Sequence, residues 1–153
     1  MKKIFAALLA VFILFSLASC KKEKESYALT IEGTDISAEI YTYFLDRVMS
    51  RPQDYGLSEK ASQKELRNAA IDDCKRYLYI NTEFAEMGLT LSAAEKVAVS
   101  QEVNNIWIRS ENHYDSIGVS KQTITKICTA EKYADAIFTK LYDKGTEDAA
   151  SEE

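Results

Sequence analysis

The sequence contains few of the residues that break helices or perform acid–base chemistry near neutral pH. It has one proline, five glycines and a single histidine in 153 residues. This scarcity, together with 46% hydrophobic residues, argues against a disordered chain and favours a packed, mainly α-helical fold. No glycine-rich phosphate loop, HExxH pair or EF-hand ligand series occurs. The carboxylates are scattered over expected solvent faces, so the sequence predicts no enzyme, no metal site and no cofactor.

Positive charge is also scarce. The chain has 19 Lys and Arg residues against 24 Asp and Glu residues, for a formal net charge of −5 at neutral pH. An acidic chain without a basic patch is a poor ligand for the phosphate backbone of DNA or RNA. The composition therefore excludes nucleic acid as an expected partner.

The first twenty residues follow the three-part pattern of a secretory signal. Met1 to Lys3 is a cationic start, and residues 4–17 are apolar apart from Ser16. A spanning helix needs about 20 apolar residues, so an uncleaved membrane anchor is the less favoured alternative. The ending Leu-Ala-Ser-Cys at residues 17–20 resembles the lipobox of bacterial lipoproteins.

The lipobox resemblance implies a lipidated protein. In that family the cysteine thiol, here Cys20, receives a diacylglyceryl group with fatty acyl chains such as palmitate, and the signal peptide, here residues 1–19, is removed. Two acyl chains give a stable hold on a bilayer, which one chain does not. The expected location is the outer face of the bacterial cytoplasmic membrane, with residues 20–26 as a lipidated, charged tether. Removal of the leader takes away Lys2 and Lys3 and no acidic residue, which leaves a net charge of about −7.

After the tether, the pattern predicts one short strand followed by helices. Apolar residues alternate over residues 27–32, as in a half-buried strand, and residues 33–35 are expected to form a turn. Apolar residues then recur at helical spacing, and two Ser-x-x-Glu capping boxes mark helix starts at Ser62 and Ser92. The expected helices cover residues 37–50, 62–87, 92–112 and 120–144. One domain over 27–145 and a disordered acidic tail over 146–153 complete the expectation.

Several residues of the predicted helices invite a functional interpretation that the pattern does not favour. Cys74 and Cys128 fall on apolar faces, so two buried thiols are preferred to a disulfide, although export would permit one. Buried thiols are inert, which argues against a nucleophile paired with His113 in the expected polar turn. Asp73 and Asn81 interrupt an apolar arc and are expected to be hydrogen-bonded at the edge of the core, with a polar point in a cleft as the alternative.

A second stripe follows the helix expected at 92–112, opposite its core face. It consists of Val97, Gln101, Asn104 and Ile108. Exposed β-branched residues are ordinary on a protein surface. The alternative is an apolar contact patch. These four residues are then the candidates for binding a polypeptide partner (a client).

Residues 84–95 (FAEMGLTLSAAE) join two helices through a glycine and a capping box. This join resembles the corresponding one in the N-terminal chaperone domain of SurA- and PrsA-type foldases. Those proteins also begin with a short strand, a glycine turn and a capped helix, here LTIEGTDIS at residues 29–37. They carry a Gly-hydrophobic-Ser helix start as well, here at residues 117–120. The resemblance spans about residues 27–145, and PrsA-type members are lipoproteins too.

The resemblance implies a SurA N-terminal-like helical domain of four to five helices that binds unfolded, exported polypeptides without catalysis. It departs from the family because the parvulin-type isomerase domain and a C-terminal helical segment are not found in these 153 residues. No prolyl isomerase activity is therefore expected. Two alternatives remain: a structural or adaptor lipoprotein that binds one folded partner, and a remnant of a truncated isomerase gene.

A lone strand over Tyr27–Glu32 would leave two backbone edges unpaired, which proteins normally cover. The sequence therefore predicts a possible homodimer in which this strand pairs with a second copy.

Overall fold

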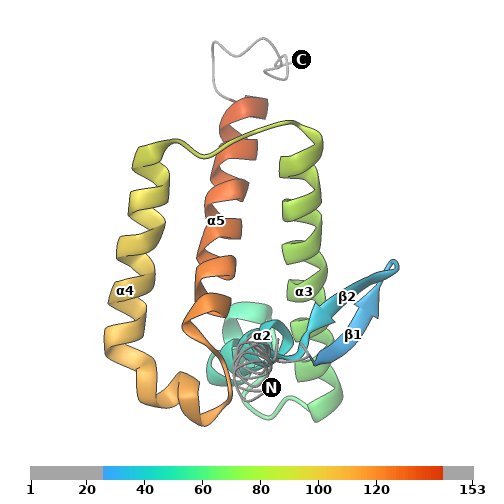
Figure 1. The fold of residues 1–153 in the computed structure, drawn as a ribbon. Helices are drawn as coiled ribbons and strands as arrows, with labels where there is room; N and C mark the ends of the chain where they lie inside the picture. Colours follow the sequence, from blue (N-terminus) through green and yellow to red (C-terminus); the bar gives the residue numbers. More distant parts are fainter. Residues whose placement is uncertain (1–25, 143–153) are drawn as a thin grey trace, which may run out of the picture.

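The computed structural model describes residues 26–142, which form a hairpin followed by helices (Figure 1). Strands β1 (Tyr27–Ile31) and β2 (Thr34–Ser37) precede α2 (Ala38–Ser50) and the short 3₁₀ helix η1 (Pro52–Tyr55). The long helices α3 (Gln63–Glu86), α4 (Ala93–Ser116) and α5 (Lys121–Tyr142) follow. The fold is mainly α, as predicted. The leader, Cys20 and the acidic tail lie outside the described residues.

The prediction of a single lone strand is wrong, because β1 pairs with β2 in an antiparallel hairpin. The two residues of the turn, Glu32 and Gly33, both have positive φ, of 50° and 82°. Two such residues are what a type I′ turn requires, and that turn suits the twist of a hairpin. Thr34 and Asp35 were expected to belong to the turn, but they begin β2, which runs directly into α2. One edge of β1 is thus covered, and the predicted homodimer now concerns its outer edge alone.

The capping residues place the helix starts as the sequence predicts. The Ser62 and Ser92 hydroxyls accept hydrogen bonds from the backbone N–H groups of Glu65 and Glu95, and both glutamates return a bond to the serine N–H. Each box satisfies two of the backbone groups that a helix start leaves unpaired. Ser37 caps α2 through its hydroxyl alone, which accepts from the Ile40 N–H, and it also belongs to β2.

Helix α4 is longer than predicted, so His113 does not lie in an interhelical turn. The helix continues to Ser116, and the chain leaves it at Gly118 with a φ of 70°. His113 occupies the last turn of α4, with its Nε2 atom 3.0 Å from Asp46 Oδ2 of α2. The polar stretch at 111–114 suggested a loop, but polar residues also occupy the solvent face of a helix, and the next glycine is Gly118.

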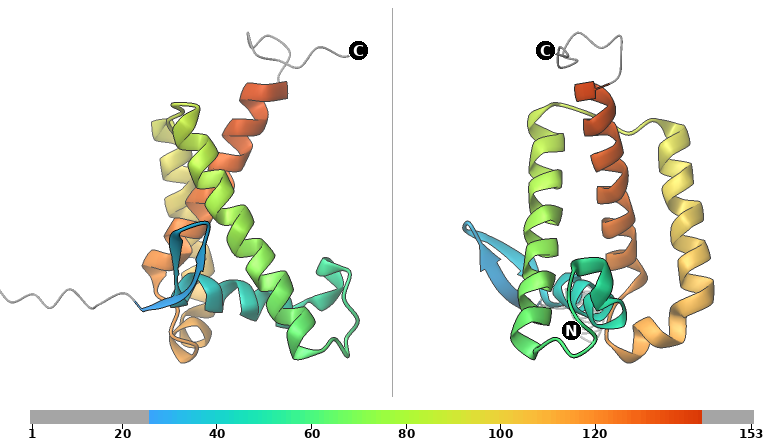
Figure 2. Two further views of the ribbon diagram at one scale, coloured as in Figure 1. Left: turned by 90° about the vertical axis from the view of Figure 1, so that its right-hand side faces the viewer. Right: turned by 180° about the vertical axis from the view of Figure 1, so that it is seen from behind.

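The three long helices lie in one layer with α5 in the middle, and α2 crosses their lower end on one face (Figures 1 and 2). Helix α3 packs against both α2 and α5. Helix α5 runs unbroken through Thr129, as expected, and contacts both α3 and α4. Helix α5 therefore packs against other helices on two of its sides.

The buried residues divide into two clusters on either side of α5. The first joins α2, α3 and α5 around Phe44, Val48, Ala70, Cys74 and Ile127. The second joins α4 to α5, and its buried members are Val99, Val103, Val119, Ile124 and Cys128. The attachment of α4 to the domain thus depends on a small group of side chains.

The start of helix α5 is hydrogen-bonded to a carboxylate of α2. Glu39 Oε2 accepts hydrogen bonds from the Ser120 N–H at 2.9 Å and from the Ser120 and Thr123 hydroxyls at 2.6 Å each. Burial alone would raise the pKa of Glu39, but these three bonds outweigh it and lower the pKa. The two helices are tied together by a charged acceptor at a helix start, where negative charge is favourable.

We expect a Glu39→Gln variant to be less stable than the wild type by about 1–2 kcal/mol at neutral pH. Hydrogen bonds to a charged group are stronger than bonds between neutral groups, while the part-buried position of the bonds to Glu39 limits the effect. The folded-state pKa is lowered, so the contribution is present above the unfolded pKa of about 4.3 and is lost as pH falls through the folded pKa. Urea unfolding at neutral and acidic pH measures the difference. The matched Glu111→Gln change, at an exposed site, should cost less than about 0.5 kcal/mol. Equal midpoints for the two variants at neutral pH would contradict the expectation.

Candidate binding groove

An open groove of about 640 Å³ lies between α4 and α5, beneath the connection that joins α3 to α4. This connection passes over α5 on the face opposite α2 (Figures 1 and 2). The groove thus has a helix on each side and a strap of backbone across its upper end. Its lining is made of Phe84, Leu89, Thr90, Leu91, Lys96, Val99, Ser100, Val103, Asn104, Lys121, Thr125, Thr129 and Tyr133.

Aromatic and aliphatic side chains line the upper half of the groove. The rings of Phe84 and Tyr133 are stacked with centroids 3.8 Å apart, which joins the end of α3 to α5. Leu91 of the connection is buried, as is Val99 in the second turn of α4. These side chains are held by the core on one side and line the groove on the other, so the apolar surface is rigid.

The α5 side of the groove is lined by threonines whose hydroxyls are already satisfied. Thr125 donates to the carbonyl oxygen of Lys121 at 2.9 Å, and Thr129 donates to that of Thr125 at 2.7 Å. A hydroxyl bonded back to its own helix makes little further demand for a polar partner. This side therefore tolerates an apolar ligand.

Two lysines contribute positive charge to the groove. Lys121 Nζ donates a hydrogen bond of 2.8 Å to Asn104 Oδ1 and so bridges α5 to α4 at the lower end. Lys96 lies in the first turns of α4 near the upper end. Lysines at a rim keep their ammonium groups in water while their apolar stems cover neighbouring surface.

Of the four candidates for client binding, the structure places only Asn104 in the groove lining. Val97 and Ile108 are 55% and 79% exposed on α4, and Gln101 is exposed as well. These three side chains share one stripe of the helix with Asn104 and follow the groove without lining it. The predicted stripe lies on a helix that borders the groove, but three of its four residues are outside the lining.

The residues that sequence reasoning missed lie on α5. Thr125 and Thr129 are one turn apart, and this i, i+4 spacing is visible in the sequence. Nothing in that spacing distinguishes a groove wall from an ordinary solvent face. The lining of the groove depends on which side of α5 meets α4, and only the folded chain shows it.

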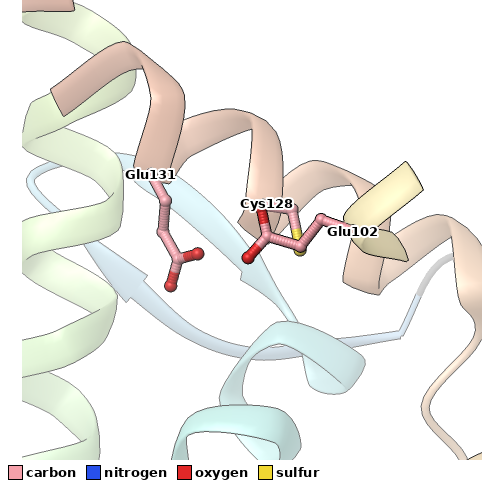
Figure 3. A group of neighbouring side chains, drawn as sticks. All are labelled: Glu102, Cys128 and Glu131. Carbon is pink, nitrogen blue, oxygen red and sulfur yellow. The ribbon is translucent and has the colours of Figure 1, made fainter. Parts of the chain in front are cut away.

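A second group of polar side chains lies on the other side of the α4–α5 pair, facing α2. Glu102 of α4 and Cys128 and Glu131 of α5 each bring one ligand atom within 4.8 Å of the others (Figure 3). They line a cavity of about 310 Å³ between α2, α4 and α5. Glu131 also forms an ion pair with Arg47 of α2 at 3.7 Å.

Burial keeps both described cysteines protonated. Cys74 and Cys128 are free and buried, as the sequence predicted, and burial raises the pKa of each thiol to about 12. A thiol is nucleophilic as the thiolate, so neither cysteine is activated in this state.

Hydrogen bonds account for the two polar residues that interrupt the apolar arc of α3. Asp73 accepts from Tyr55 and Arg76, and the Asn81 amide donates to the Tyr77 carbonyl.

No family model, curated protein or solved structure matches this chain. The resemblance to the foldase chaperone domain therefore stays a prediction that depends on the quoted motifs. Within residues 26–142, no helix is both long enough and apolar enough to cross a membrane.

Proposed function

We propose that this protein is a lipid-anchored, non-catalytic chaperone that binds apolar segments of unfolded, exported polypeptides in the groove between α4 and α5. The observation that carries the proposal is the groove itself. It is open, has a volume of about 640 Å³, and presents apolar side chains on a rigid helical frame. Its size is in the range of about 300–1,000 Å³ that small ligand sites occupy, which suits a few side chains of an extended segment.

The chemistry of the lining favours a ligand of variable sequence. Apolar and threonine side chains provide contact area without fixed hydrogen-bond partners, so no particular side chain of a client is required. Burial of apolar surface contributes about 25 cal/mol per Å² and is non-directional. The expected binding is therefore weak, reversible and tolerant of client sequence.

The lipobox supports a location where such clients occur. A diacylated Cys20 and a charged tether over residues 20–26 would hold the domain near the outer face of the membrane, where exported chains emerge unfolded. The acidic net charge of the chain opposes its own association. Both features agree with a holding role and require no reaction.

The test is whether the full chain slows the aggregation of several unrelated denatured proteins, followed by light scattering. We expect Thr125→Glu to weaken this protection about tenfold, because an apolar client segment would have to cover the new carboxylate, and a factor of ten corresponds to about 1.4 kcal/mol. Thr139→Glu is the matched control, since it makes the same change at an exposed position of α5 outside the groove lining. It should protect like the wild type.

Two results would count against the proposal. Equal protection by both threonine variants would remove the groove as the binding site. Failure of the wild type to protect any client, together with tight binding of one folded protein, would favour the adaptor lipoprotein instead.

A further inference from the structure

We propose that Glu102, Cys128 and Glu131 form a binding site for one Zn²⁺ ion in the cavity between α2, α4 and α5. The site lies on the opposite side of the α4–α5 pair from the groove. It does not depend on the proposed chaperone function.

The three side chains converge from two helices. Cys128 and Glu131 are three residues apart on α5 and so share a face, while Glu102 reaches the same space from α4 (Figure 3). A tetrahedral zinc site with bonds of about 2.0–2.3 Å places its ligand atoms about 3.3–3.8 Å apart. The present separations of up to 4.8 Å need to shrink by about 1 Å, which the long, rotatable side chains of the two glutamates can supply.

The buried thiol points to a soft divalent cation. Cys128 is only 2% exposed, yet it lines the cavity instead of facing the apolar core alone. Carboxylates without a thiol would suit Mg²⁺ or Ca²⁺, whereas a thiolate with carboxylates suits Zn²⁺. Three protein ligands leave a fourth position for water, and the cavity of about 310 Å³ has room for it.

The charges around the site balance once the ion is bound. Binding transfers the Cys128 proton to solvent, and two carboxylates, a thiolate and Zn²⁺ then sum to one negative charge. Arg47, already paired with Glu131, offsets that charge.

In the absence of the ion, the carboxylates of Glu102 and Glu131 bring like charges close together beside the neutral thiol. Burial, Glu131 and Glu102 all raise the pKa of the Cys128 thiol, and burial and Glu102 raise the pKa of Glu131. A divalent cation between the two carboxylates would offset their charges. The other titratable and charged groups that face the site are Tyr43, Asp46, Arg47 and Arg51 of the α2 side, Tyr114 of α4, and Lys132 and Asp135 of α5.

Cobalt is the probe, because it takes zinc sites and shows a thiolate-to-metal charge-transfer band. The full chain carrying Cys20→Ala, in detergent, is titrated with Co²⁺ and then with Zn²⁺. We expect one Co²⁺ per chain, a thiolate band, displacement by Zn²⁺ and no displacement by Mg²⁺. Zn²⁺ should also raise the melting temperature in proportion to the logarithm of its concentration, because the ion ties α4 to α5.

Two variants and one control identify the ligands. Cys128→Ala should abolish the band, and Glu102→Gln should weaken Co²⁺ binding by at least about tenfold, since even the loss of a residue that only orients a ligand costs 10- to 100-fold. Cys74→Ala removes the other buried thiol and should leave the band unchanged. Glu102 is part-exposed, so its variant keeps the test valid if Cys128→Ala does not fold. Absence of a band in the wild type, or its persistence in Cys128→Ala, would overturn the site.

Discussion

A Cys20→Ala variant is expected to incorporate no fatty acid label, and the mature lipid-anchored form should disappear from the membrane fraction. The lipobox interpretation places the whole anchor on one thiol, and alanine offers no atom for the thioether bond. Each buried CH₂ of an acyl chain contributes about 0.8 kcal/mol to membrane binding, so the loss of two chains removes far more than a tether of a few charges can replace. Growth with labelled palmitate followed by fractionation measures both effects.

The matched control for this experiment is Ser19→Ala. It changes the neighbouring small residue to another small one and leaves the thiol, so the variant should be labelled like the wild type. Label on the Cys20→Ala protein would refute the lipoprotein assignment, and the tether over residues 20–26 would then need another explanation.

The second large effect is expected at Ile124, which is fully buried between α4 and α5. Ile124→Ala should lower the free energy of unfolding by about 3 kcal/mol, because a buried Ile-to-Ala change typically costs 2–5 kcal/mol. The loss should not be uniform. The cluster around Ile124 attaches α4, whereas α2 and α3 are held by the other cluster, so hydrogen exchange should quicken more in α4 than in α3.

Ile108→Ala is the control, since it removes the same atoms from a side chain that is 79% exposed on α4. Its cost should be below about 0.5 kcal/mol. If the two variants unfolded at the same denaturant concentration, the second cluster would not hold α4 in the way the packing indicates.

The helix starts could be predicted from the sequence because their signals are local. A Ser-x-x-Glu box acts within four residues, so the starts of α3 and α4 needed no knowledge of the rest of the chain. The errors arose where a polar stretch was given more weight than backbone geometry. Strand β2 is only four residues long and lies between a turn and a helix cap, which makes its pattern too short to recognise. Helix α4 continues through the polar residues Glu111 and Asn112.

The candidate sites depend on which helix faces meet, and a single sequence does not encode that directly. The Cys-x-x-Glu spacing on α5 was visible, but Glu102 is 26 positions earlier and joins it only through the packing of α4 on α5. Likewise, Asn104 lines the groove and is hydrogen-bonded to Lys121, while Val97 on the same stripe is outside the lining. Such residues are brought together by tertiary structure.

The carboxylate of Glu39 has a consequence for the order in which the domain forms. Its partners Ser120 and Thr123 follow it by 81 and 84 residues, so most of the domain is made before they exist. A growing chain emerges from its N-terminus, and contacts between distant residues form only after the intervening loop has closed. Until α5 is made, the Glu39 carboxylate near the junction of the hairpin and α2 therefore lacks Ser120 and Thr123 as partners. Helix α2 packs mainly against α3, and the last helix adds the hydrogen bonds to Glu39, so a nascent chain interrupted before residue 120 should be more open to proteases than the full domain.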